Sequence, residues 1–187
     1  MNDPYFFGYG SLVNTKTHVY QDAQPAKLYG WRRVWKHTNA RDIAFLTIVP
    51  SNRTELLGLI AKVPNADWVA LDAREEGYER LVATDMITHD RSDNPELAIY
   101  VIPEPTRFPP TPDHPILLSY LDVVLQGYLH IFGAAGVQHF METTDGWDTI
   151  VLNDRGNPIY PRAQSLSADE TALVDACLKQ VGAQLRD

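Results

Sequence analysis

Hydrophobic and polar positions in the first hundred residues form short runs that are typical of β-strands. The runs are rich in β-branched and aromatic residues, and Pro, Gly, Asn or Asp stand at their ends. They predict strands in six segments, which are PYFFGY (4–9), AKLYGWRRVWK (26–36), IAFLTIVP (43–50), ELLGLIAKVP (55–64), YERLVATDMITHD (78–90) and ELAIYVIP (96–103).

One stretch in this half has a helical period instead, NADWVALDAREEG at 65–77. Asn65 is a plausible N-cap for the helix, Asp67 falls in its first turn, and Gly77 is a natural stop. A short helix is therefore expected between the fourth and fifth strands.

The second half of the chain is mostly helical in pattern. Six prolines between Pro103 and Pro115 predict an extended, irregular loop. Residues 115–133 are apolar nearly all round and predict a buried helix, and residues 134–144 predict a second, shorter one. Residues 147–164 indicate either a short hairpin or an irregular lobe.

The last segment carries a clear helix start. Ser167 and Glu170 fit a capping box, and an apolar stripe follows at Val174, Leu178, Val181 and Leu185. With strands first and helices later, the order predicts an α+β fold with a strongly curved or closed sheet that is rich in antiparallel strands. We expect a single domain over residues 1–187, with a helical or irregular C-terminal lobe from about residue 133.

The charge and cysteine content narrow the class of protein. Lys and Arg number 16 against 24 Asp and Glu, a net charge of -8, which argues against nucleic acid or an anionic membrane as a partner. Apolar runs are too short for a membrane span, and no signal peptide is recognised at the start. A soluble, cytoplasmic protein is expected, and its oligomeric state stays open.

The sequence does not match the spacing of several common site motifs. Val13 stands where the dinucleotide pattern G-x-G-x-x-G needs its third glycine, and no P-loop lysine follows the glycines. Tyr9 stands where a G-x-S-x-G elbow around Ser11 needs glycine. The six histidines lack metal-ligand spacing, and Cys177 is expected to be a buried, inert thiol. We therefore expect neither a metal nor a cofactor.

One carboxylate in the predicted short helix has an unusual position. Glu75 lies four residues after Leu71 and seven after Trp68, so it shares the apolar face, whereas Glu76 is rotated by about 100° towards the side of Asp72. A carboxylate that faces a core needs a partner or takes a raised pKa, and both are typical of a general acid or base. The alternative is an ordinary solvated helix face.

Two motifs in this order resemble the gamma-glutamylcyclotransferase-like family, including its ChaC-like branch. The first is FGYGSL at 7–12 and the second is LDAREEGYERL at 71–81. The segments LYGWRR (28–33), LLGLIAKVP (56–64) and LLSYLDVVLQGYL (117–129) also look like that family's strands and following helix. The likeness covers roughly residues 4 to 132.

The resemblance implies a small mixed, curved or closed β-barrel flanked by helices. Its first strand-to-helix turn would hold a γ-glutamyl group through backbone N–H groups. The stretch concerned is Tyr9, Gly10, Ser11 and Leu12, with Val13 at its end. Glycines there let the backbone approach closely or take a positive φ. The family's Leu-Asp-x-x-Glu pattern places the catalytic general base and acid on Glu75. A tyrosine of the following helix faces the site in the family, which makes Tyr120 a candidate for substrate binding or, equally, a core residue; Tyr78 is a weaker candidate.

The activity that the resemblance implies is cyclisation of a γ-glutamyl amide to 5-oxoproline, with release of an amine or amino acid. The substrate is then a small γ-glutamyl molecule such as a γ-glutamyl amino acid, a γ-glutamyl amine or glutathione. Two other interpretations stay open. One is a non-catalytic barrel that binds an acidic metabolite or, through RFPPTP at 107–112, a partner peptide. The other is a γ-glutamyl hydrolase.

Overall fold

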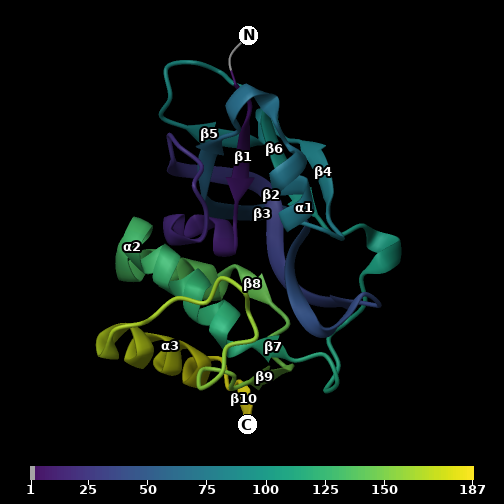
Figure 1. Ribbon diagram of the computed structural model, residues 1–187, viewed down its shortest axis with the longest axis vertical. Helices are drawn as coiled ribbons and strands as arrows, with labels where there is room; N and C mark the ends of the chain where they lie inside the picture. Colours follow the sequence, from purple (N-terminus) through teal and green to yellow (C-terminus); the bar gives the residue numbers. More distant parts are fainter. Residues whose placement is uncertain (1–2) are drawn as a thin grey trace.

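The computed structural model describes residues 3–187 and has a curled sheet at one end and helices at the other (Figure 1). Its strands are β1 (Tyr5–Gly8), β2 (Gln24–Thr38), β3 (Arg41–Lys62), β4 (Glu79–Val82), β5 (Ile87–His89), β6 (Leu97–Val101), β7 (Ile116–Leu117), β8 (Thr144–Asp145), β9 (Ile150–Leu152) and β10 (Gln184–Arg186). The helices are α1 (Val69–Arg74), α2 (Leu118–Glu142) and α3 (Ala168–Gln180). None of the helices within residues 3–187 combines the length and apolar character needed to cross a membrane.

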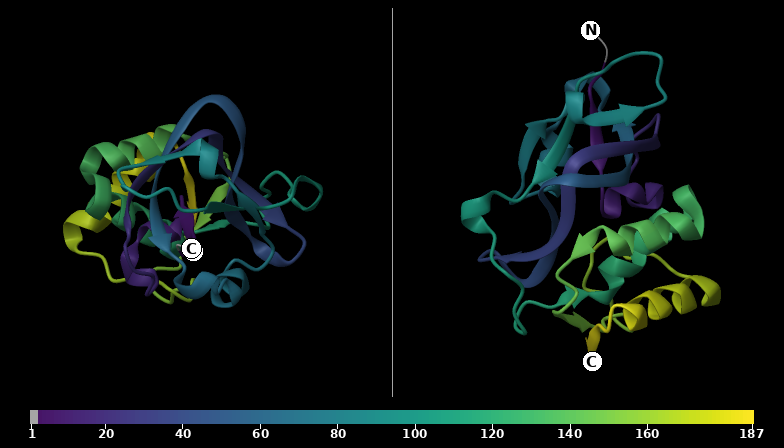
Figure 2. Two further views of the ribbon diagram at one scale, coloured as in Figure 1. Left: turned by 90° about the horizontal axis from the view of Figure 1, so that it is seen from above. Right: turned by 180° about the vertical axis from the view of Figure 1, so that it is seen from behind.

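The larger sheet is mixed and has the strand order β4-β6-β1-β3-β2-β5, with β8 added beside β2. β1 pairs antiparallel with β3 and parallel with β6, so the first strand lies in the middle of the sheet. The sheet curls into an open half-barrel, and α2 lies across the end to which β1 points (Figures 1 and 2). The expected curved α+β fold is confirmed.

A long hairpin of β2 and β3 causes most of the curl. The register changes between Tyr29, opposite Glu55, and Trp31, opposite Pro50, at a point where Gly30 has a φ of +82°. Such an irregularity disrupts the ladder locally and bends the strand, and glycine and proline are commonly found there. Residues 43–50 and 55–64 were expected to be two strands, but β3 runs through both because the polar residues between them continue in extended conformation.

The short helix α1 begins later than its sequence predicts. Asn65 has a φ of +56° in a tight turn and is not the N-cap; that position belongs to Trp68. Asp67 lies just before the helix, where its carboxylate accepts a hydrogen bond from the amide of Val69 at 3.1 Å. Gly77, with a φ of +91°, ends the segment as expected. The acidic residue therefore supplies the cap that was assigned to Asn65.

The C-terminal segment forms a small parallel sheet with the order β10-β9-β7, and α3 packs beside α2. Gly133 has a φ of +67° and divides α2, which agrees with two expected helices. The capping box of Ser167 and Glu170 is confirmed. The prediction of a hairpin within residues 147–164 is wrong, because β9 pairs with β7 and β10, which lie outside this segment. The remainder of the segment is irregular. The single domain with a lobe from about residue 133 stays a prediction.

The end of α3 differs from the predicted apolar stripe. Val174 and Leu178 are buried, but the helix ends at Gln180, and Leu185 lies in β10 with 56% of its surface exposed. Gly182, with a φ of +67°, turns the chain out of the helix and into pairing with β9. The assignment of Leu185 to the stripe is therefore wrong. Cys177 is buried, as expected.

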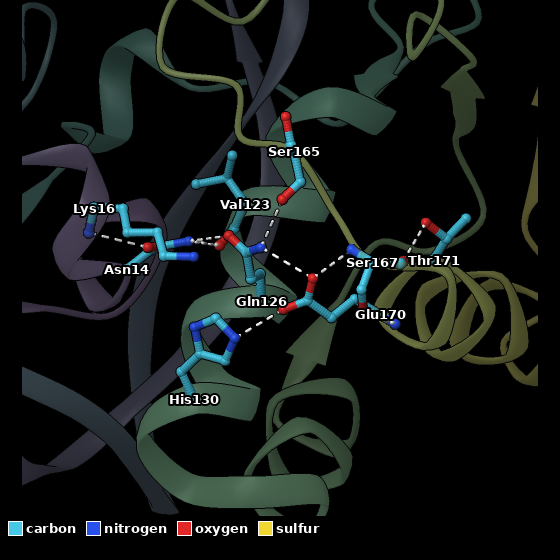
Figure 3. Close-up of polar contacts among 9 residues, drawn as sticks. All are labelled: Asn14, Lys16, Val123, Gln126, His130, Ser165, Ser167, Glu170 and Thr171. Atoms are coloured by element: carbon cyan, nitrogen blue, oxygen red, sulfur yellow. Dashed lines mark hydrogen bonds and ion pairs between the residues drawn. The ribbon is translucent and has the colours of Figure 1, made fainter.

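A chain of hydrogen bonds connects the first turn of the barrel to both long helices (Figure 3). The Asn14 amide donates to the carbonyl of Val123 at 2.9 Å and to the side chain of Gln126 at 3.0 Å. The Gln126 amide in turn donates to Glu170 at 3.2 Å, the same carboxylate that caps α3 together with Ser167. The position of α2 relative to the turn after β1 is thus specified by polar contacts as well as by apolar packing.

Candidate active site

A cavity of about 360 Å³ opens between the sheet and the C-terminal segment, beside the end of β1. A smaller recess of about 30 Å³ adjoins it and is lined by the backbone turn from Gly8 to Leu12. Both spaces share the side chains Ser11, Leu46, Glu75, Tyr78 and Tyr120. Residues from the first turn, from the end of α1 and from the start of α2 therefore meet at one place.

Glu75 lies directly after α1, and its amide donates to the carbonyl of Leu71 at 2.9 Å. Leu71 is fully buried, and the Glu75 side chain is only 17% exposed. The next residue, Glu76, has a side chain that is 80% exposed. The helical face expected for Glu75 is therefore the inward one, and the two adjacent glutamates have opposite environments.

Burial raises the pKa of the Glu75 carboxyl above its ordinary value. Two guanidinium groups, those of Arg74 and Arg162, oppose this by favouring the charged form, and Arg74 Nε lies 3.2 Å from the Glu75 carboxylate. The burial effect outweighs them, so the pKa stays raised. A carboxyl in this state exchanges a proton near neutral pH more readily than an exposed one.

Arg74 also connects Glu75 to the turn after β1. It donates to the carbonyl of Thr17 at 2.8 Å, to its hydroxyl at 3.1 Å and to the hydroxyl of Ser11 at 3.3 Å. Arg74 thus fixes the position of the Glu75 carboxylate relative to the turn after β1. Sequence reasoning missed Arg74, because an arginine near a helix end is ordinary and its partners lie about sixty positions earlier.

The turn itself is built by close approach. A side chain at Gly8 would come within 2.5 Å of Leu12 Cβ, and one at Gly10 would come within 2.7 Å of the Tyr120 hydroxyl. Neither glycine has a positive φ. The expectation of positive φ is therefore wrong, and the glycines are needed because the space for a Cβ is already filled.

A short 3-10 helix follows over Ser11–Val13. The Val13 amide donates to the Gly10 carbonyl at 3.0 Å, which closes the turn. Val13 is thus the first residue whose amide has an acceptor within this short helix. The amides of Gly10, Ser11 and Leu12 come before it and have none there, as holds for the opening amides of any helix. These three residues line the recess, whereas Val13 is fully buried in the core and lines neither space.

Tyr9, Tyr78 and Tyr120 are three of the four tyrosines that line the recess. The Tyr9 hydroxyl donates to the carbonyl of Tyr100 at 2.6 Å, and that of Tyr78 donates to the carbonyl of Leu46 at 2.7 Å. Tyr120 lies edge-on to Trp35 and to Tyr160 and faces both spaces. Burial raises the pKa of each of these phenols, Tyr9, Tyr78 and Tyr120, so they are neutral hydrogen-bonding groups.

The outer part of the cavity comes from two segments that no motif had singled out. Tyr160, Pro161 and Arg162 belong to the irregular stretch after β9, and Arg41 lies at the tip of the β2–β3 hairpin. Apolar side chains of the hairpin and of Ile159 complete this wall. No group of three or more metal-ligating side chains occurs in the part of the chain that the structure describes.

Residues 4–109 match the ChaC-like protein family, which is more than half of the chain. The chain belongs to this ChaC-like family. Both sequence motifs, the turn after β1 and the segment that carries Glu75, lie inside the matched region. No curated protein sequence matches the chain.

Solved structures share the fold of this chain. A gamma-glutamyl cyclotransferase is similar with a TM-score of 0.59 at 15% identity over 93% of this chain and 99% of its own. An uncharacterized protein from Homo sapiens has a TM-score of 0.57 at 16% identity, over 94% of this chain and 99% of its own. YkqA from Bacillus subtilis has a TM-score of 0.59 at 15% identity, over 76% of this chain and 54% of its own. At these identities the likeness shows the gamma-glutamylcyclotransferase-like fold of this ChaC-like chain.

Proposed function

We propose that this ChaC-like protein is a γ-glutamyl cyclotransferase, with Glu75 as general base and acid. The observation that carries the proposal is the position of one largely buried carboxylate, raised in pKa, against a recess lined by the glycine turn after β1. Family membership and the fold of a gamma-glutamyl cyclotransferase support the same reaction.

In this reaction the substrate supplies its own nucleophile. The neutral α-amine of the γ-glutamyl group attacks the γ-carbonyl carbon with its nitrogen, and Glu75 accepts a proton from that nitrogen as the new bond forms. A five-membered ring forms and the carbonyl oxygen becomes an oxyanion. The bond from that carbon to the leaving nitrogen then breaks as Glu75 returns the proton to the leaving amine. The products are 5-oxoproline and a free amine or amino acid.

The amides of Gly10, Ser11 and Leu12 are the proposed partners of the substrate's negative charge, either the α-carboxylate or the oxyanion. One well-aimed donor to an oxyanion is worth about 3–4 kcal/mol. Tyr120, which covers the turn, is the proposed partner of a substrate oxygen, and Tyr9 contributes its backbone to the same turn. Val13 makes no contact with the recess, so we give it no part in binding.

The outer wall indicates the kind of leaving group. Arg162 and Arg41 place two cations beside apolar side chains there, and Arg41 also pairs with the exposed carboxylate of Glu76 at 3.6 Å. A leaving amine that carries both apolar atoms and a carboxylate, as the amino-acid half of a γ-glutamyl peptide does, complements this wall better than a simple amine.

Incubation of the protein with a panel of γ-glutamyl peptides, amino acids and amines, followed by mass spectrometry, tests the proposal. We expect 5-oxoproline from at least one class, and no product from Glu75→Gln although that variant folds. Free glutamate in place of 5-oxoproline would mean that water attacks and that the enzyme is a hydrolase. Saturable binding without any product would mean a non-catalytic binding protein.

A further inference from the structure

Arg33 lies in β2, and its side chain is fully buried behind the turn that follows β1. Its Nε donates to the carbonyl of Tyr9 at 2.8 Å, and one terminal nitrogen donates to the Thr143 hydroxyl at 2.7 Å. The other terminal nitrogen donates to the carbonyl of Leu57 at 2.5 Å and to the hydroxyl of Tyr128. A single guanidinium thus joins the end of β1, strand β3 and helix α2.

The charge of Arg33 has no acidic partner in the described part of the chain, where no carboxylate lies within 4.0 Å of the guanidinium. All of its hydrogen-bond acceptors are carbonyls and hydroxyls. The rings of Tyr128 and Phe140 lie 5.1 and 4.9 Å from its central carbon. Arginine keeps its proton in proteins, so a full positive charge is buried here without a compensating anion.

The contact with Tyr9 determines how the next amide is oriented. The Tyr9–Gly10 peptide bond is trans, and in a trans peptide the C=O and the following N–H point in opposite directions. Because Arg33 and the Tyr128 hydroxyl, 3.0 Å away, both contact the Tyr9 oxygen, the Gly10 N–H points away from them. Gly10 is one of the residues that line the recess, together with Glu75 and Tyr120.

We infer that Arg33 is the positioning residue of the substrate-binding turn: it holds the Tyr9–Gly10 peptide so that the Gly10 N–H faces the recess, and its buried charge favours an anionic substrate group there. This inference rests on the proposed function for its kinetic consequence, but its structural consequence is independent of any activity. Tyr128 takes part by holding the same carbonyl and by accepting a hydrogen bond from Arg33.

The experiment compares four variants of the full chain. Arg33→Met removes the charge and every hydrogen bond, while Arg33→Lys keeps the charge and loses the planar fork of donors. Tyr128→Phe removes only the hydroxyl. Arg32→Met is the matched control, because Arg32 is the adjacent residue of the same strand and pairs with the exposed carboxylate of Asp145 at 2.6 Å.

Kinetics on the best γ-glutamyl substrate, corrected for the folded fraction, supply the first readout. We expect kcat/KM to fall about a hundredfold in Arg33→Met, in line with the loss of one aimed donor. Arg33→Lys should recover about tenfold of that loss because the charge is restored. Arg32→Met should stay within about twofold of the wild type. A purely structural role for Arg33 would lower the folded fraction and leave both kcat and KM of the folded protein unchanged, which would overturn the inference.

The second readout is the orientation of the Tyr9–Gly10 peptide, from crystal structures and from the Gly10 amide resonance. We expect this peptide to rotate in Arg33→Met and the Gly10 resonance to shift, with no shift in Arg32→Met. If the wild type turns over no γ-glutamyl compound, the proposed function fails, and the peptide orientation alone decides the inference on Arg33. If Arg33→Met does not fold, Arg33→Lys and Tyr128→Phe supply the same two readouts. An unrotated peptide together with unchanged kinetics in the folded variants contradicts the inference.

Discussion

The inner and outer walls of the cavity are built in opposite ways. The inner wall consists of the turn after β1, Glu75 and Tyr120, and its groups are buried and held by hydrogen bonds to the sheet and to α2. The outer wall consists of Arg41, Arg162 and neighbouring apolar side chains from a hairpin tip and an irregular segment. Electrostatic effects are stronger where water is excluded. We therefore propose that the chemical step takes place at the inner wall and that the outer wall selects the leaving group.

The largest effect is expected from Glu75→Gln. The amide cannot exchange the proton that cyclisation needs, so the rate of 5-oxoproline formation should fall by about a thousandfold, within the usual range for a lost general acid–base. Glu76→Gln is the matched control. Its side chain is 80% exposed and pairs with Arg41 of the outer wall, so this variant should keep the wild-type kcat. If both variants lost the same share of the rate of 5-oxoproline formation, the prediction that only the inward glutamate takes part in the reaction would be contradicted.

Gly10→Ala tests the backbone turn of the inner wall. Its Cβ would lie 2.7 Å from the Tyr120 hydroxyl, so either the turn or the tyrosine must shift. We expect kcat/KM to fall about a hundredfold, because one donor is misdirected. Gly10→Ala should also lower the urea concentration at the midpoint of unfolding. In the double variant with Tyr120→Phe the closest contact is removed, so part of that loss should be recovered. If the double variant is no more stable than Gly10→Ala alone, the clash has been assigned to the wrong atom.

Tyr120→Phe alone measures whether this tyrosine serves the substrate or the core. Loss of a hydrogen bond worth about 1 kcal/mol lowers kcat/KM roughly fivefold. A tyrosine that only packs would change the stability and leave kcat/KM unaltered. Tyr78→Phe is the comparison, because the Tyr78 hydroxyl already donates to the carbonyl of Leu46.

The raised pKa of Glu75 predicts how stability depends on pH. The folded protein holds the Glu75 proton more tightly than the unfolded chain, so this group contributes stability that is fully present below the ordinary carboxyl pKa of 4.5. That contribution is lost as the pH rises through the raised pKa of the folded state. In Glu75→Gln it is absent, so the free energy of unfolding of the variant relative to the wild type should increase with pH. Urea titrations between pH 4.5 and 8 measure the difference, and a constant difference contradicts the prediction.

The smallest effect is expected at the outer wall, from Arg162→Ala. Exposed ion pairs contribute at most about 1 kcal/mol, so KM for a γ-glutamyl peptide should rise by up to about fivefold. KM for a γ-glutamyl amine without a carboxylate should not change. Because Arg162 also favours the charged form of Glu75, any change in kcat should be the same for both substrates. An equal rise in KM for both substrates would contradict a role of Arg162 in the choice of leaving group.

Local patterns in the sequence predicted a large part of the fold and one side of the site. Alternating apolar runs located the strands, the capping box at Ser167 began α3, and helical periodicity turned Glu75 inward. These succeeded because each depends on residues a few positions apart. The errors occurred at segment ends, as at Asn65 and Leu185, where a left-handed residue or pairing with a distant strand replaced the local preference.

The amino-acid sequence by itself determined the two motifs of this ChaC-like chain, the glycine turn and the glutamate that faces the core. Only the tertiary structure decided what holds and surrounds them. Arg33 meets a tyrosine 95 positions away, and Arg74 meets a serine 63 positions away. The outer wall joins a hairpin tip to a segment near the end of the chain. Such contacts follow from the packing of α2 across the half-barrel, and no short-range period in the sequence encodes them.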